Sequence, residues 1–147
     1  MKLEGNAAIQ APVEQVWNFL TDAHQISQCA PGLQSMEVVT PDQKFKAVGS
    51  IGFGTVKLNF TADVEWLELD PMQKAKVKAH ATAPGSAIDV VAEMAFREES
   101  EDSTGLAWAA EVTVVGTIAS LASRMMGGVA KRVTNAFFDC VKKQIET

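Results

Sequence analysis

Residues 75–83 read AKVKAHATA and alternate strictly between a polar side and a side of small residues. Such a period of two is typical of a β-strand with one buried face. The polar side carries Lys76, Lys78, His80 and Thr82, whereas the other side carries four alanines and one valine. Because a buried strand face is normally filled by Val, Ile, Leu or Phe, another group is expected to occupy the space beside these alanines.

The same alternation continues on both sides of this stretch and predicts an antiparallel sheet. Short segments rich in Gly, Pro, Asp and Ser separate the strands, so neighbouring strands are expected to pair without long crossovers. A first strand is expected over residues 1–10. Six more are expected over residues 32–39, 43–51, 55–69, 73–83, 87–99 and 105–116.

Helical periodicity appears in three places. Pro12 begins a pattern with apolar residues at helical spacing up to Leu20, and a second short helix is expected around residues 24–29. After Gly116 the period changes to 3.6 and predicts one long amphipathic helix to the C-terminus. The expected architecture is therefore α+β, a single domain over residues 1–147 in which a curved, seven-stranded antiparallel sheet wraps around the last helix.

Composition excludes several classes of function. The formal charge of −5 argues against nucleic acid or acidic lipid as the main partner. The apolar stretch over residues 112–130 contains too many Gly, Ser and Thr residues to span a membrane. With no signal peptide expected, Cys29 and Cys140 are interpreted as separate core residues in a reducing cytoplasm, forming neither a disulfide nor a metal site.

The inward faces of four strands carry an unusual number of alanines. These are Ala62, Ala75, Ala79, Ala81, Ala83, Ala92 and Ala110. Each alanine in place of leucine removes three carbons, and at about 0.8 kcal/mol per buried methylene an empty space would cost on the order of ten kcal/mol. Either the long helix packs unusually close to the sheet, or an apolar ligand fills a cavity between them.

The cavity interpretation predicts a specific set of lining residues on four strands and on the first part of the long helix. These are Phe60, Ala62, Ala79, Ala81, Ala92, Met94, Trp108, Ala110, Leu121, Met125, Met126 and Val129. Gly127 and Gly128 follow the two methionines and lower helix propensity there. They predict either an adaptable gate, a close packing contact or a helix that begins near Met125.

Groups suited to acid–base or nucleophilic chemistry are few. The chain has no tyrosine, His80 alternates outward, and His24 lies in the short-helix region. Neither cysteine has a histidine partner in a recognisable motif. The protein is therefore expected not to be an enzyme and to need no metal or cofactor, although Trp66 and Trp108 could stack on a flat ring.

Four stretches match a known family. They are APGLQSMEVV (30–39), FKAVGSIGFGTVKLNFTADVEWLELD (45–70), ATAPGSAIDVVAEMAF (81–96) and VTVVGTIASLASRMMGGVAKRV (112–133). With them the whole chain resembles the carbon monoxide dehydrogenase G-subunit family, within the START-like superfamily of polyketide cyclases and lipid-transport proteins. The resemblance implies the helix-grip fold of that superfamily.

The resemblance also implies a cytoplasmic accessory protein of a molybdenum-containing dehydrogenase. Its ligand is expected to be a hydrophobic small molecule, a quinone or a lipid, that links the enzyme to the membrane. Because the chain ends at Thr147, directly after the long helix, transient contact with the inner face of the membrane is expected rather than permanent anchoring.

Two alternatives stay open at this point. The first is an assembly or membrane-recruitment factor that docks through basic helix positions without transferring a ligand. That surface would comprise Arg124, Lys131, Arg132, Lys142 and Lys143, with an exposed Phe138 beside them. The second alternative is a cyclase or hydrolase that works inside the same cavity.

Overall fold

A computed structural model describes residues 1–41, 43–53 and 55–146 of the chain. Asp42 and Gly54, which belong to two of the predicted turns, and Thr147 lie outside the described residues. The strands are β1 (Lys2–Ile9), β2 (Leu33–Thr40), β3 (Lys44–Phe53), β4 (Val56–Asp70), β5 (Lys74–Ala83), β6 (Ser86–Ser100) and β7 (Ser103–Gly116). The helices are α1 (Val13–Leu20), α2 (Ala23–Ile26) and α3 (Ala119–Ile145).

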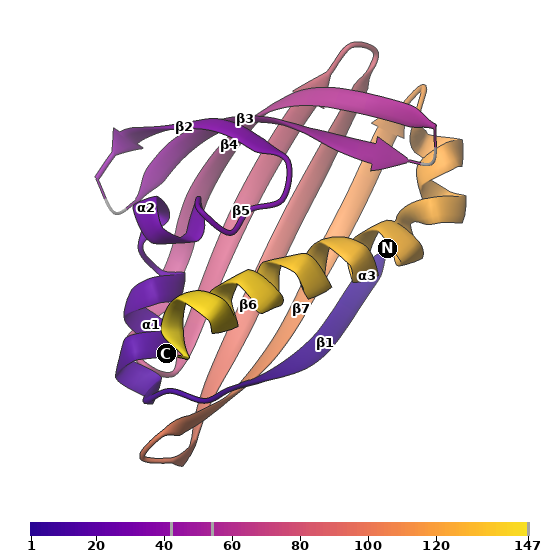
Figure 1. Cartoon of the computed structure of the whole chain (residues 1–147). Coiled ribbons are helices and arrows are strands. Elements are labelled where there is room, and N and C mark those ends of the chain that lie inside the picture. The colour runs from indigo at the N-terminus through magenta and orange to yellow at the C-terminus, as the bar shows by residue number, and fades with distance from the viewer. Residues whose placement is uncertain (42, 54, 147) are drawn as a thin grey trace.

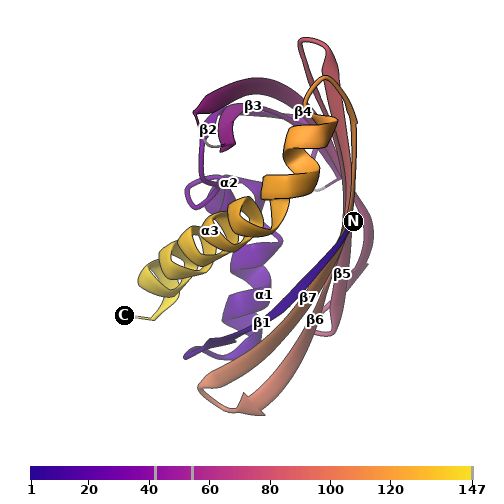
Figure 2. The same cartoon turned by 90° about the vertical axis from the view of Figure 1, so that its right-hand side faces the viewer.

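Within the described residues, the seven strands form one antiparallel sheet in the order β1-β7-β6-β5-β4-β3-β2. The sheet is strongly curved, and all three helices lie on its concave side (Figures 1 and 2). The long helix α3 crosses this face, while α1 lies beside its C-terminal end (Figure 1). The predicted α+β fold, with a seven-stranded sheet around a C-terminal helix, is confirmed.

Strand boundaries agree with the alternation to within a few residues, whereas α2 is shorter than expected. It comprises four residues and ends before Cys29, although the sequence favoured a helix that continued to that residue. Asp22 begins the helix, because its side chain accepts a hydrogen bond of 2.9 Å from the backbone N–H of His24. Residues 27–29 then form turns that lead into β2.

Two separate clusters of buried side chains hold the helices to the sheet. The first core lies around α1 and the C-terminal part of α3, and it includes Val16, Leu20, Phe96, Leu106 and Val141. The second core lies around the start of α3, and it consists of Leu58, Val112, Ile118, Ala122, Met126 and Val129. The concave face is therefore filled by side chains at its two ends.

Thr104 contributes a polar interaction to the buried interior. Its side chain is fully buried, and its hydroxyl donates a hydrogen bond of 2.8 Å to the carbonyl oxygen of Ala11. This bond fixes the chain between β1 and α1 against the start of β7. Without it, the carbonyl of Ala11 would lose a partner away from water.

Replacing Thr104 by valine is therefore expected to lower the free energy of unfolding by about 1–2 kcal/mol, since valine keeps the shape but not the hydroxyl. Urea unfolding of the variant measures the loss. Thr113→Val on the same strand, at an exposed position, is the matched control and should stay within about 0.5 kcal/mol of the parent. Equal stability of the two variants would contradict the role given to this bond.

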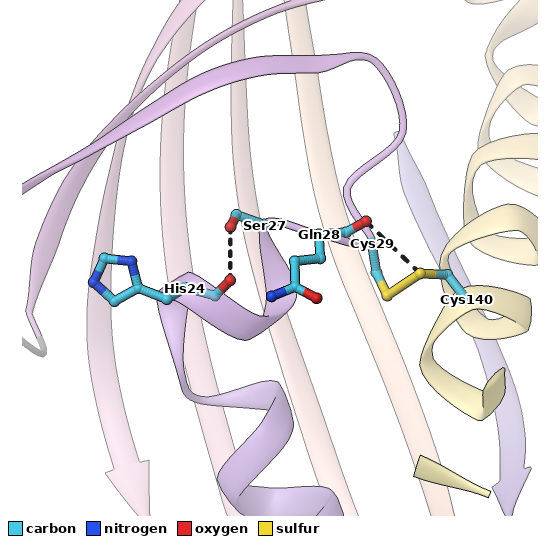
Figure 3. The surroundings of a disulfide bond; sticks show 5 residues. All are labelled: His24, Ser27, Gln28, Cys29 and Cys140. Atoms are coloured by element: carbon cyan, nitrogen blue, oxygen red, sulfur yellow. Dashed lines mark hydrogen bonds between the residues drawn. A yellow bond between two sulfur atoms is a disulfide. The ribbon is translucent and has the colours of Figure 1, made fainter. Parts of the chain in front are cut away.

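The two cysteines form a disulfide, so the prediction that they remain separate core residues is wrong (Figure 3). Cys29 precedes β2 and Cys140 lies on α3, 111 residues further along the chain, with their Cα atoms 5.4 Å apart. The fold brings the turn after α2 next to the C-terminal half of α3. Nothing in the local pattern around either cysteine signals this contact, because it depends on how α3 crosses the sheet.

The apolar stretch over residues 112–130 divides between β7 and α3. No helix of the described residues is both long enough and apolar enough to cross a membrane.

Candidate ligand-binding site

Strand register gathers the inward alanines into one continuous patch. Ala47, Ala62 and Ala81 lie side by side on β3, β4 and β5. Ala92 on β6 is paired with Ala110 on β7, and the strand β5 between these groups contributes a further alanine. The alanine floor is defined here as Ala47, Ala62, Ala79, Ala81, Ala92 and Ala110.

The middle of this floor lies between the two cores. Ala79, Ala81 and Ala92 are only half-buried and belong to neither cluster of core residues. Ala75, on the same face of β5, is by contrast completely buried in the first core. Side chains from the helices therefore cover the two ends of the concave face more completely than its centre.

The path of α3 explains this difference. The helix makes its main contacts with β1 and β7 on one side of the sheet and with β3 on the other. The central strands β4, β5 and β6 carry most of the alanine floor and contact the helix less. A helix that rests on both sides of a curved sheet is held away from the strands in the middle.

Aromatic residues border the floor. Phe60 and Trp108 are half-buried and, like the central alanines, belong to neither core. Trp108 lies against Gly5 of β1, where an added Cβ atom would be 2.8 Å from the indole ring. The small residue on β1 thus provides room for a large flat side chain on the concave face.

The remaining residues of the predicted site lie nearer the cores. Met94 packs against the first core, whereas Ala110, Leu121 and Met125 pack against the second. Met126 and Val129 are buried members of the second core, with exposed fractions of 6% and 3%. The strand residues thus come together as predicted, while the helix residues mainly fill a core. Their role in ligand binding stays a prediction.

Sequence reasoning missed Ala47 as part of this surface. Its strand alternates Phe45, Ala47, Gly49 and Ile51, and this pattern would have placed it on the inward face together with the other alanines.

Two of the depressions away from the floor lie beside α2, and neither was predicted. A groove of about 660 Å³ lies between α1, α2 and the end of α3, and its lining includes Gln25, Gln28 and Gln144. A more enclosed pocket of about 220 Å³ has Phe45 and Trp66 in its wall and His24 beside them. Both are formed by segments that are distant in sequence, so no local sequence pattern predicts them.

Ionisable side chains gather on the outer face of the sheet. Lys74 and Glu93 are 2.7 Å apart, and their hydrogen bond raises the pKa of the lysine and lowers the pKa of the glutamate. Both groups are exposed, so salt screens their attraction. His80 points outward as predicted and lies 2.5 Å from a carboxylate oxygen of Asp89. The inward alternating positions hold no ionisable residue.

The two glycines of α3 have no packing role. A Cβ atom added at Gly127 or Gly128 would meet nothing within 4 Å, and the helix begins at Ala119, well before them. The interpretations as a close packing contact or as a helix start are therefore wrong. Figure 2 shows the first turns of α3 at an angle to the rest of the helix. A locally weak helix at this position agrees with the gate interpretation.

Replacing Gly127 or Gly128 by alanine is expected to raise the free energy of unfolding by about 0.5–1 kcal/mol each, because alanine gains helix propensity without a clash. Urea unfolding measures the gain. Gly85→Ala provides the contrast, since Gly85 has a φ of +74° and should lose stability. A lower free energy of unfolding for Gly127→Ala would contradict the open surroundings described above.

Two members of the basic surface proposed for docking have other contacts. Arg132 donates a hydrogen bond of 3.0 Å to the carbonyl oxygen of Gly52, which connects α3 to the end of β3. Phe138, predicted to be exposed, is half-buried against the first core and meets Phe137 edge to face. The prediction that Phe138 is exposed is therefore wrong, whereas Arg132 stays exposed on the flank of the helix. Arg124, Lys131 and Lys143 are exposed.

Comparison with known proteins gives one family. The sequence profile of the family described as the G subunit of carbon monoxide dehydrogenase (CoxG) matches residues 5–146. This confirms the resemblance predicted from the sequence. No protein of curated function matches the chain.

Several solved structures share the fold. A conserved protein from Geobacillus kaustophilus has 27% sequence identity and a TM-score of 0.92, over 99% of this chain and 95% of that one. The Zhui aromatase/cyclase from Streptomyces sp. R1128 has 16% identity and a TM-score of 0.76, over 99% and 93%. A START superfamily protein from Mycobacterium smegmatis has 11% identity and a TM-score of 0.71, over 99% and 97%.

These likenesses correct one expectation. The aromatase/cyclase is an enzyme built on the same fold, so the prediction that this chain is not an enzyme is contradicted. The prediction relied on the lack of acid–base groups on the inward strand faces, whereas the structure also places His24 at the edge of the pocket beside Trp66. A group outside the alternating strands can thus lie next to a concave site.

Proposed function

We propose that this protein, which belongs to the carbon monoxide dehydrogenase G-subunit family, binds an apolar small molecule between the alanine floor and α3. The observation that carries the proposal is the position of the floor. Its central residues Ala79, Ala81 and Ala92 face inward, yet helix side chains leave them half-buried between two cores. An apolar molecule lying there would complete the burial of this surface.

The residues around the floor favour a particular class of ligand. Alanine methyl groups offer a smooth apolar surface, and Phe60 and Trp108 at its borders offer aromatic rings. Such surroundings suit a flat ring or a hydrocarbon chain, which gain dispersion and stacking contacts without needing charged partners. A quinone with an isoprenoid chain, or a lipid, meets both requirements.

The family supports an accessory role for this binding. We infer that the protein serves a molybdenum-containing dehydrogenase of the carbon monoxide type and carries the apolar molecule between that enzyme and the membrane. The proposal places it in the cytoplasm, with transient contact at the inner face of the membrane. Recruitment or assembly without ligand transfer is the competing explanation.

Cyclase-like chemistry is a second candidate function, favoured by His24 at the rim of the pocket that includes Phe45 and Trp66. A histidine beside an apolar pocket could move a proton to or from a bound molecule. In that case the purified protein should convert a bound compound. Replacing His24 by alanine should then remove turnover while leaving binding unchanged.

Native mass spectrometry of the purified protein, followed by organic extraction, tests the proposal. We expect one quinone or lipid molecule per chain, released by the solvent and identified by its mass. A protein that is empty and also fails to take up added quinone would contradict ligand binding and favour the assembly explanation. Reversing the charges of Arg124, Lys131 and Lys143 should then impair dehydrogenase assembly, whereas a carrier should tolerate it.

A further inference from the structure

The disulfide joins a firmly held element to a weakly held one. On the α3 side, Val141 next to Cys140 is completely buried, and Ile145 is 5% exposed. On the other side, none of the four described residues of α2 is buried, and Ile26 only packs partly against the first core. The disulfide through Cys29 links the α2 segment, residues 22–32, directly to α3 (Figure 3).

The two cysteines differ in exposure. Cys29 has an exposed fraction of 4%, whereas Cys140 is half-buried on α3 beside the backbone of the exposed Gln28. We therefore expect a thiolate from solution to attack the sulfur of Cys140, with the sulfur of Cys29 as the leaving group. This asymmetry is typical of a bond that exchanges rather than of one enclosed on both sides.

The α2 segment also borders the groove and the pocket described above. Gln25 and Gln28 line the groove next to α1, and Ala23 and His24 line the pocket that contains Trp66. Movement of α2 would change both at once. Because Trp66 lies on the inward face of β4 as a buried member of the first core, an opening beside it would uncover this end of the concave face.

We propose that Cys29 and Cys140 form a reversible thiol–disulfide switch that holds α2 as a flap over this side of the concave face. The exchange partner is a small thiol or dithiol of the cell. Its thiolate attacks the sulfur of Cys140 and forms a mixed disulfide, while Cys29 leaves as a thiolate. A second thiolate then attacks the partner's sulfur and releases Cys140, so two thiols are oxidised to one disulfide as the protein disulfide is reduced.

The oxidised protein keeps the flap closed, and the reduced protein lets the α2 segment, with Cys29 and Ile26, open locally while the other side chains of both cores stay packed. Faster ligand exchange in the reduced state is the functional consequence, and this part rests on the proposed function. The switch itself depends only on the behaviour of the α2 segment.

Hydrogen exchange measured by mass spectrometry on the oxidised and the dithiothreitol-reduced protein tests the switch. We expect amides in residues 22–32 to exchange at least tenfold faster after reduction, with residues 76–82 of β5 unchanged. Cys140→Ser should behave like the reduced protein in both buffers. If that variant fails to fold, the reduced parent provides the same comparison. Unchanged exchange in residues 22–32, or two freely alkylated cysteines in oxidised glutathione, would overturn the switch.

Dissociation of the fluorescent probe 8-anilinonaphthalene-1-sulfonate from the same samples separates the two proposals. Release at least tenfold faster from the reduced protein supports the flap as a gate for the ligand. Equal release from both forms would overturn that gating. If the probe binds neither form, the proposed ligand site fails, while the exchange of residues 22–32 still decides whether the switch exists.

Discussion

Replacing Ala92 by tryptophan is expected to weaken the binding of an apolar ligand at least about 100-fold while the protein stays folded. Ala92 lies at the centre of the alanine floor, paired with Val77 on one side and Ala110 on the other. It is half-buried and outside both cores, so we expect an indole ring at this position not to displace core side chains. The ring then fills the volume that the ligand would use.

Fluorescence titration with an isoprenoid quinone measures the loss, and urea unfolding checks the fold. Ala95→Trp is the matched control, because Ala95 lies on the same strand but is exposed on the outer face. This variant should bind the quinone with the same affinity as the parent. Unchanged affinity of Ala92→Trp would remove the floor from the binding site. A loss of stability above about 3 kcal/mol would show instead that α3 already packs on Ala92.

Replacing Gly32 by alanine is expected to lower the free energy of unfolding by about 2–4 kcal/mol. Gly32 has a φ of +80°, and an added Cβ atom would lie 2.1 Å from the carbonyl oxygen of Ser50. The same residue accepts a hydrogen bond of 3.0 Å from the backbone N–H of Ser50, which begins the pairing of β2 with β3. Backbone atoms must therefore move, and the edge strand loses its first contact.

Gly52→Ala is the control for this substitution, because nothing lies within 4 Å of a Cβ atom added there. Its stability should stay within about 1 kcal/mol of the parent in urea unfolding. The expected difference between the two variants reflects geometry rather than the chemical change, which is identical. Two variants of equal stability would mean that the turn before β2 can rearrange freely.

Much of the fold follows from local pattern. The strict alternation over residues 75–83 predicts both the strand β5 and the direction of each of its side chains, because successive residues of a strand point to opposite faces. The change to a period of 3.6 after Gly116 likewise predicts α3. The excess of inward alanines is evident from the alternation alone, and strand register then brings five of them together with Ala47.

The position of α3 above the sheet was beyond sequence reasoning. Periodicity shows which side of a helix is apolar, but not how far from the strands it lies or which strands it contacts. Phe138 illustrates the consequence, since it was expected to be exposed and instead packs against the first core. The same limit applies to the two depressions that α1 and α2 border.

The sequence by itself therefore determined the order of strands and helices along the chain, the inward faces of β1 and of β4 to β7, and the family of the protein. Each of these depends on residues that are neighbours along the chain or on motifs that can be read in order. Only the tertiary structure decided that Cys29 meets Cys140, that two cores leave the centre of the alanine floor half-buried between them, and that α2 borders the groove and the pocket. These features arise where segments distant in sequence pack together, and the curvature of the whole sheet sets those distances.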